Sequence, residues 1–107
     1  MFGGLGEMAG LMKKFGEIRE NMKKMKEELA STAITGKDPA GKVVLEMTGD
    51  MLVRGVHIDP ALLSPGNSRM LETACASAMQ DALIQFKKLT EGKLSEATGG
   101  LNLPGLM

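Results

Sequence analysis

Basic side chains gather in one short part of this chain, residues 13–26, and could contact phosphate groups. Lysine predominates over arginine there, which suits diffuse attraction to a phosphate backbone better than bidentate recognition of base edges. Acidic residues interleave with the basic ones, so a solvated surface with intrahelical ion pairs is the competing interpretation. The six basic residues are Lys13, Lys14, Arg19, Lys23, Lys24 and Lys26.

A second, smaller basic cluster lies near the end of the last predicted helix and consists of Lys87, Lys88 and Lys93. These residues could add phosphate contacts. Cations also stabilise a helix C-terminus by interacting with its exposed carbonyl groups, which is a simpler explanation for their position.

The residues that could support catalysis do not form a recognisable constellation. His57 is the only histidine and Cys75 the only cysteine, and both fall inside regular predicted elements. Asp59 precedes a proline and is better interpreted as the end of a strand than as a general base. Gly4 and Gly6 lack the preceding strand and the following Gly-Lys-Ser/Thr of a phosphate-binding loop. We therefore predict a protein that is not an enzyme and has no cofactor, metal or small-molecule substrate.

The first basic cluster falls on a predicted helix over about residues 7–31. Apolar residues recur there at alternating three- and four-residue spacing, a narrow coiled-coil seam that favours packing on another helix, plausibly of a second copy. The glycine-rich residues 1–6 are expected to be flexible. The seam consists of Met8, Leu11, Phe15, Ile18, Met22, Met25 and Leu29.

The middle of the chain predicts three short strands joined by tight turns, as in an antiparallel meander. The strands are expected at residues 31–35, 43–48 and 51–58, with turns at 36–41 and 49–50. In the second strand Val43, Leu45 and Met47 share one face. Residues 61–63 are expected to form a short helical turn.

A second long helix is predicted over about residues 68–95, capped by Asn67 or Ser68. Its apolar stripe is broad enough to cover a sheet, and the glycine- and proline-rich residues 97–107 are expected to be a disordered tail. The stripe contains Leu71, Cys75, Ala78, Ala82, Phe86 and Leu89, widened by Met70, Ala74, Met79 and Leu83.

The length indicates a single domain, residues 1–107, and the order of a long helix, a three-stranded meander and a second long helix indicates the α+β class. Three phenylalanines are the only aromatic residues, so the core is small and dimerisation is expected to add stability. The absence of aromatic platforms argues against single-strand readers of the stacking type. The lone cysteine and the lack of a signal-peptide pattern favour a cytoplasmic location, and no apolar run approaches a membrane span.

The order of motifs resembles the YbaB/EbfC family of bacterial nucleoid-associated proteins. The resemblance rests on the Met1-Phe2-Gly3 start and on a first helix rich in methionine, lysine and glutamate. It continues through Thr35-Gly36, Ala40-Gly41, the Val43-Val44 strand and Gly49. It is clearest in Val56-His57-Ile58-Asp59-Pro60-Ala61-Leu62-Leu63, and it ends with Met70-Leu71-Glu72, Ala74, Ala78, Ala82 and the tail.

The resemblance implies an α-β-β-β-α protomer and an intertwined homodimer with projecting helical arms. It implies binding to DNA as a chromosome-associated factor at the nucleoid. Together with the predominance of lysine, this predicts binding to double-stranded DNA with weak or no sequence preference. The basic residues of both clusters then become DNA-binding candidates.

Two alternatives stay open from the residues alone. A prefoldin-like chaperone or adaptor would need matching seams on both helices, and a membrane-surface helix would need a less interrupted basic face.

Overall fold

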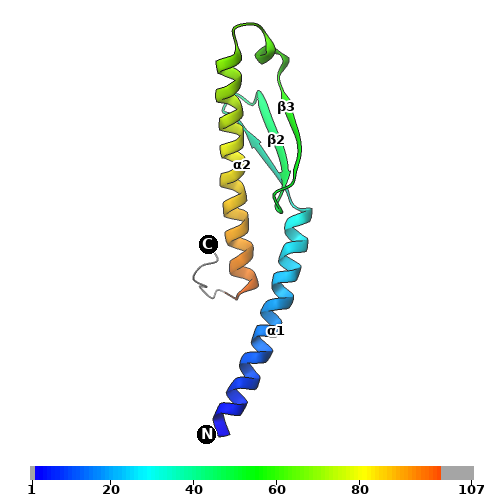
Figure 1. Cartoon of the computed structure of the whole chain (residues 1–107), viewed down its shortest axis with the longest axis vertical. Coiled ribbons are helices and arrows are strands. Elements are labelled where there is room, and N and C mark those ends of the chain that lie inside the picture. The colour runs from blue at the N-terminus through cyan, green and yellow to red at the C-terminus, as the bar shows by residue number, and fades with distance from the viewer. Residues whose placement is uncertain (1, 100–107) are drawn as a thin grey trace.

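The computed structural model describes residues 2–99 and shows an elongated molecule of 77 × 22 × 15 Å. Helix α1 (Phe2–Ser31) leads into strands β1 (Ala33–Lys37), β2 (Val43–Thr48) and β3 (Val53–Ile58), and a short 3-10 helix η1 (Pro60–Leu63) precedes helix α2 (Ser68–Ala97). The predicted α-β-β-β-α order is confirmed. Figure 1 shows α2 beside the sheet and α1 continuing past the end of α2.

Helix α1 begins five residues earlier than predicted, at Phe2. Extending an existing helix adds a hydrogen bond for each residue that is fixed, so the glycine-rich start can join it at a cost of about 1 kcal/mol per glycine. At 1.5 Å per residue, α1 is about 45 Å long.

The three strands form an antiparallel sheet in the order β1-β2-β3. The predicted bounds and face of β2 are confirmed, because Val43, Leu45 and Met47 are all buried. The first strand was placed too early and the third too long. Residues 36 and 37 belong to β1, and residues 51 and 52 precede β3.

Helix α2 covers β1 and β2 and leaves β3 largely uncovered. Ala82 packs against Ile34, Leu45 and Met47, and Ala78 packs against Val43 and Leu62. Gly36 explains why the layers lie so close together. A Cβ atom at Gly36 would lie 2.3 Å from the Ala78 carbonyl oxygen, so only glycine fits beneath the helix.

The two edges of the sheet differ. The backbone N–H of Lys37 donates to the Asp81 carboxylate at 2.9 Å, and the Gln85 side-chain amide donates to the Thr35 carbonyl at 2.8 Å. These two bonds provide hydrogen-bond partners for backbone groups on the outer edge of β1. No strand within residues 2–99 pairs with the outer edge of β3.

The predicted apolar stripe of α2 is confirmed along its centre, but three of the residues expected at its edges are exposed. Ala74 is buried as expected, but Met70 and Met79 are each 56% exposed and Leu83 is 47% exposed. The reason is that α2 reaches across two strands and not three.

The two ends of α2 also differ from expectation. Asn67 occupies the N-cap position, but its side chain accepts no capping hydrogen bond from the helix; its Nδ2 amide group donates to the Ala61 carbonyl at 2.9 Å. At the other end, Ala97 is buried in the helix and Thr98 forms the C-cap, so the expectation of disorder is wrong for residues 97 and 98. Residues 100–107 of the expected tail lie outside the described residues.

Candidate nucleic-acid interface

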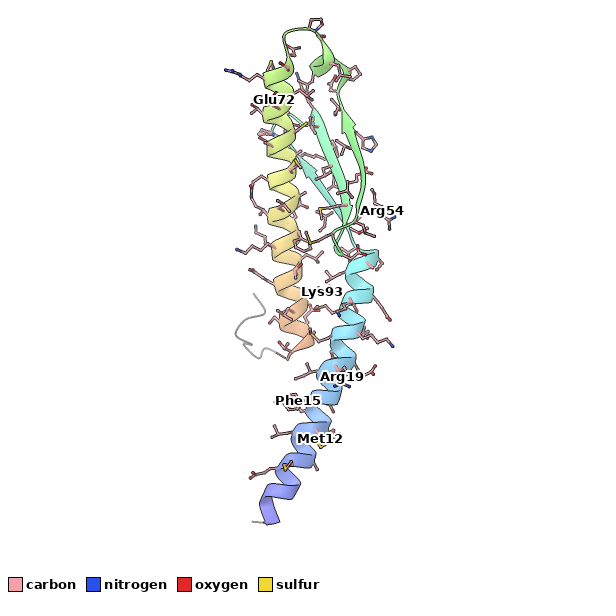
Figure 2. All side chains as sticks on the ribbon, viewed as in Figure 1. Met12, Phe15, Arg19, Arg54, Glu72 and Lys93 are labelled. Carbon is pink, nitrogen blue, oxygen red and sulfur yellow. The ribbon has the colours of Figure 1, made fainter. Side chains whose placement is uncertain are left out.

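The basic residues of α1 are distributed over a packed half and a projecting half. Near its C-terminal end, Met25 and Leu29 pack against Ala97 of α2 and are buried. Residues 6–20, here called the arm, extend past the end of α2 (Figures 1 and 2). The arm carries Lys13, Lys14 and Arg19, whereas Lys23, Lys24 and Lys26 follow on the packed half. All six side chains are exposed.

The coiled-coil seam divides at the same place. Met25 and Leu29 are 9% and 7% exposed, whereas Leu11 and Phe15 are 54% and 63% exposed. The expected helix partner is therefore α2 of the same chain, over the C-terminal part of the seam. The N-terminal part has no partner among the described residues.

Three of the six basic residues form a stripe along one side of α1. Arg19, Lys23 and Lys26 are spaced by four and three residues, which places them within about 60° of one another on the helix surface. Side chains three and four positions apart are neighbours on a helix. Arg19 and Lys26 have only apolar, glycine or lysine residues at those positions, whereas Lys23 lies three residues from Glu20 and four residues from Glu27. No salt bridge in the described part of the chain involves this Arg19 stripe.

The other three basic residues of α1 stand among carboxylates. Lys13 and Lys14 are four and three residues from Glu17, and Lys24 is four residues from both Glu20 and Glu28 and three residues from Glu27. Lys24 also contributes to lowering the Glu28 pKa by its charge. Their attraction for an external phosphate is partly offset by these neighbours.

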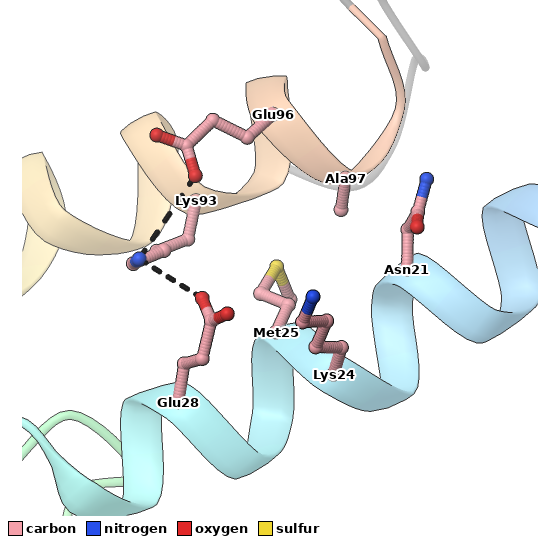
Figure 3. Close-up of a pocket in the computed structure, with 7 residues that line it drawn as sticks. All are labelled: Asn21, Lys24, Met25, Glu28, Lys93, Glu96 and Ala97. Carbon is pink, nitrogen blue, oxygen red and sulfur yellow. Dashed lines mark hydrogen bonds and ion pairs between the residues drawn. The ribbon is translucent and has the colours of Figure 1, made fainter.

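Lys93 of the second cluster is engaged within the chain (Figure 3). Its ammonium group donates to the Glu28 carboxylate at 2.9 Å and lies 3.9 Å from Glu96. The hydrogen bond between Lys93 and Glu28 raises the pKa of Lys93 and lowers the pKa of Glu28. This ion pair, here called the clasp, joins α2 to α1. Lys87 and Lys88 are exposed and lie outside it.

The residues considered for catalysis lie apart. His57 is exposed on β3, and its Nε2 lies 3.5 Å from the carboxylate of Glu46 on the neighbouring strand β2. Cys75 is half-buried against the α2–sheet core. Within residues 2–99 no cluster of three or more histidine, cysteine or acidic residues could hold a metal ion. No helix of that part is long and apolar enough to cross a membrane.

Sequence reasoning missed one further pair of cations. Lys42 and Arg69 lie 27 residues apart in the chain. Both line a hollow of about 410 Å³ between the β1–β2 turn and the start of α2. No local pattern links the two residues, because only the fold brings the turn and the helix together.

The fold and its cations define a class of small, elongated α+β proteins that present basic residues on a projecting helix. The chain belongs to the YbaB/EbfC DNA-binding family, whose family model matches residues 4–101. Family membership makes this chain a DNA-binding protein.

A solved structure, an uncharacterized protein HP0035 from Helicobacter pylori, has the same fold. It is 21% identical, with a TM-score of 0.65 over 91% of this chain and 96% of that chain.

Proposed function

We propose that this protein is a homodimeric, nucleoid-associated protein of the cytoplasm that binds duplex DNA through phosphate contacts, without reading sequence. It acts as a binding protein and not as an enzyme. The carrying observation is the Arg19 stripe in a chain of a DNA-binding family: it is an exposed row of three cations, two of which, Arg19 and Lys26, have no acidic neighbour three or four positions away.

The stripe ranks the candidate contacts. Arg19 and Lys26 make the main phosphate contacts because they have no acidic neighbours, and Lys23 adds a contact because it lies between them in the same row, although Glu20 and Glu27 are beside it. Lys87 and Lys88 add weaker ones, as do Lys13, Lys14 and Lys24 among their carboxylates. Lys93 is assigned to the clasp, because a phosphate would have to displace Glu28 from it.

Salt dependence tests this ranking. Neutralising Z phosphates gives a slope of log K against log salt of about −0.9Z. Three contacts in each protomer of a dimer therefore predict a slope near −5, or about a thousandfold loss of affinity between 50 and 200 mM salt. We would measure binding to random-sequence duplexes by gel shift and by fluorescence anisotropy.

The decisive comparison uses two triple variants that remove the same charge. Arg19→Ala/Lys23→Ala/Lys26→Ala is expected to lose most of the salt slope, and Lys13→Ala/Lys14→Ala/Lys24→Ala only a small part. Alanine favours helices, so both variants should keep their circular dichroism spectrum. Equal losses in the two variants would contradict the ranking, and unchanged binding in both would remove α1 from the interface.

The dimer interface is proposed at β3. Val53 and Val56 are 61% and 51% exposed, although they pair with Met47 and Leu45 and so face the same side as the buried core. On α2, Leu83 is exposed on the flank away from β1, whose edge is held by Asp81 and Gln85. A second copy that covers this surface would bury the apolar residues and protect the open strand edge.

Two neighbouring residues provide a matched test of the interface. Leu83 and Ile84 are 47% and 46% exposed but lie about 100° apart on α2. Leu83→Asp is expected to give monomers by light scattering, whereas Ile84→Asp stays dimeric. A monomeric wild type would overturn the dimer, and a dimeric Leu83→Asp would place the interface elsewhere.

A further inference from the structure

The hollow beside Lys42 and Arg69 lies at the end of the molecule opposite the arm. It is enclosed by the β1–β2 turn, η1 and the first turns of α2, at the end shown uppermost in Figure 1. Its volume of about 410 Å³ falls within the range of small-molecule sites, roughly 300–1,000 Å³.

Small side chains create the hollow and apolar ones line it. Ala74 and Ser77 leave space on the α2 side, and Pro39 and Leu62 contribute apolar surface from the turn and from η1. Met70 borders the same space. Met70 is 56% exposed, which was not expected, and it therefore adds apolar surface to the hollow that no residue of 2–99 covers.

The charges around the hollow are unbalanced. Asp38 is its only acidic lining residue, and the Asp38 carboxylate accepts hydrogen bonds from the backbone N–H groups of Val43 at 2.8 Å and Ala40 at 3.3 Å. The bond from Val43 is the main reason why the Asp38 pKa is lowered. Lys42 and Arg69 have no salt bridge in the described part of the chain. The hollow therefore combines an apolar lining with two cations that form no salt bridge within residues 2–99.

We propose that this hollow binds a small amphipathic anion, an apolar body that carries one carboxylate group. Lys42 and Arg69 would hold the carboxylate, and Leu62, Met70 and Ala74 would contact the apolar body. Asp38 holds the turn in shape through its backbone hydrogen bonds and does not contact the ligand. The site lies on the β1 side of α2 and leaves the proposed β3 surface free, so occupancy does not depend on DNA binding or on dimerisation.

Decanoate is the probe for a titration of the full-length, ¹⁵N-labelled protein without DNA, followed by NMR. Amide shifts are expected to saturate at residues 38–42 and 69–77. Two matched ligands separate the two requirements: acetate has the charge without the apolar body, and 1-decanol has the body without the charge. Both are expected to bind at least about fivefold more weakly than decanoate.

Variants then assign the cations. Lys42→Ala/Arg69→Ala is expected to weaken decanoate binding by about five- to thirtyfold, since each partly exposed ion pair contributes at most about a factor of five. Lys87→Ala/Lys88→Ala removes the same charge from α2 away from the hollow and should bind as the wild type does.

Several results would overturn the proposal. These are shifts that cluster on β3, equal weakening in the two double variants, or binding of decanol as tight as that of decanoate. Displacement of decanoate from residues 69–77 by a short DNA duplex would instead assign the two cations to the DNA interface. Loss of DNA binding in the α1 variants has no bearing on these outcomes.

Discussion

Replacing Gly36 with alanine tests the close approach of α2 to the sheet. A Cβ atom there would meet the Ala78 carbonyl oxygen at 2.3 Å, and the Cβ and backbone nitrogen of Ala82 at 2.6 and 2.7 Å. Ordinary contacts begin near 3.4 Å, so the helix must move by about 1 Å. Two of the three atoms belong to the backbone, and no rotamer change can relieve them.

That movement would loosen the best-buried part of the core. Ala78 and Ala82 are 1% and 0% exposed, and they contact the buried faces of β1 and β2. Overpacking usually costs about 1–3 kcal/mol. Because the clash is with backbone, we expect Gly36→Ala to lower the free energy of unfolding by about 3 kcal/mol. With an m-value of about 1–3 kcal/mol/M, the urea midpoint falls by about 1–3 M.

Gly55→Ala is the matched control within the same sheet. A Cβ at Gly55 would meet only side-chain atoms of His57 and Glu46, at 3.7 and 3.9 Å, which are ordinary contacts. We expect a change within about 0.5 kcal/mol. Both variants would be unfolded in urea at one fixed protein concentration, since association shifts the midpoint. If Gly36→Ala and Gly55→Ala were equally stable, the close helix–sheet approach at Gly36 would be refuted.

Two further predictions concern charges on α1. Ala30→Glu places a carboxylate four residues after Lys26, and it should lower the salt slope of DNA binding by about two per dimer, one contact from each protomer. Asn21→Glu adds the same charge outside the Arg19 stripe and should change the slope less; equal effects would show that only total charge matters. The clasp predicts a pH dependence, because the Glu28 pKa is lowered from 4.5 and the Lys93 pKa is raised from 10.5. Its stabilisation is present between these values, lost as pH falls below about 4.5 and lost as pH rises above about 10.5. The difference in urea midpoint between wild type and Lys93→Met should therefore shrink at both extremes, and a constant difference at pH 3 would contradict the clasp.

Strand β2 shows what the sequence could predict. The alternation of Val43, Leu45 and Met47 with more polar residues is a local signal, and it defined both the bounds and the buried face of the strand. Gly36 had no such signal. It was assigned to a turn because glycine is common in turns, whereas its actual role depends on a helix more than 40 residues later in the chain.

The seam of α1 shows a different limit. Its spacing correctly predicted helix–helix packing but could not show that Met25 and Leu29 meet α2 of the same chain, nor where that contact ends. Lys93 was similarly ambiguous, because its partner Glu28 lies 65 residues away. Local pattern identified the cations, and only the fold separated those with partners from those without.

The formal net charge of zero does not weaken the case for phosphate binding. At physiological salt, exposed charges interact over about 8 Å, the Debye length, whereas the molecule is 77 Å long. Acidic residues near the sheet therefore cannot offset the field of α1. The attraction of a phosphate depends on the local balance of charge within about one helical turn. This charge balance is positive at Arg19 and Lys26 and nearly neutral at Lys24. The distribution of acidic neighbours along α1 thus decides which of its cations are available to DNA, and the total charge does not.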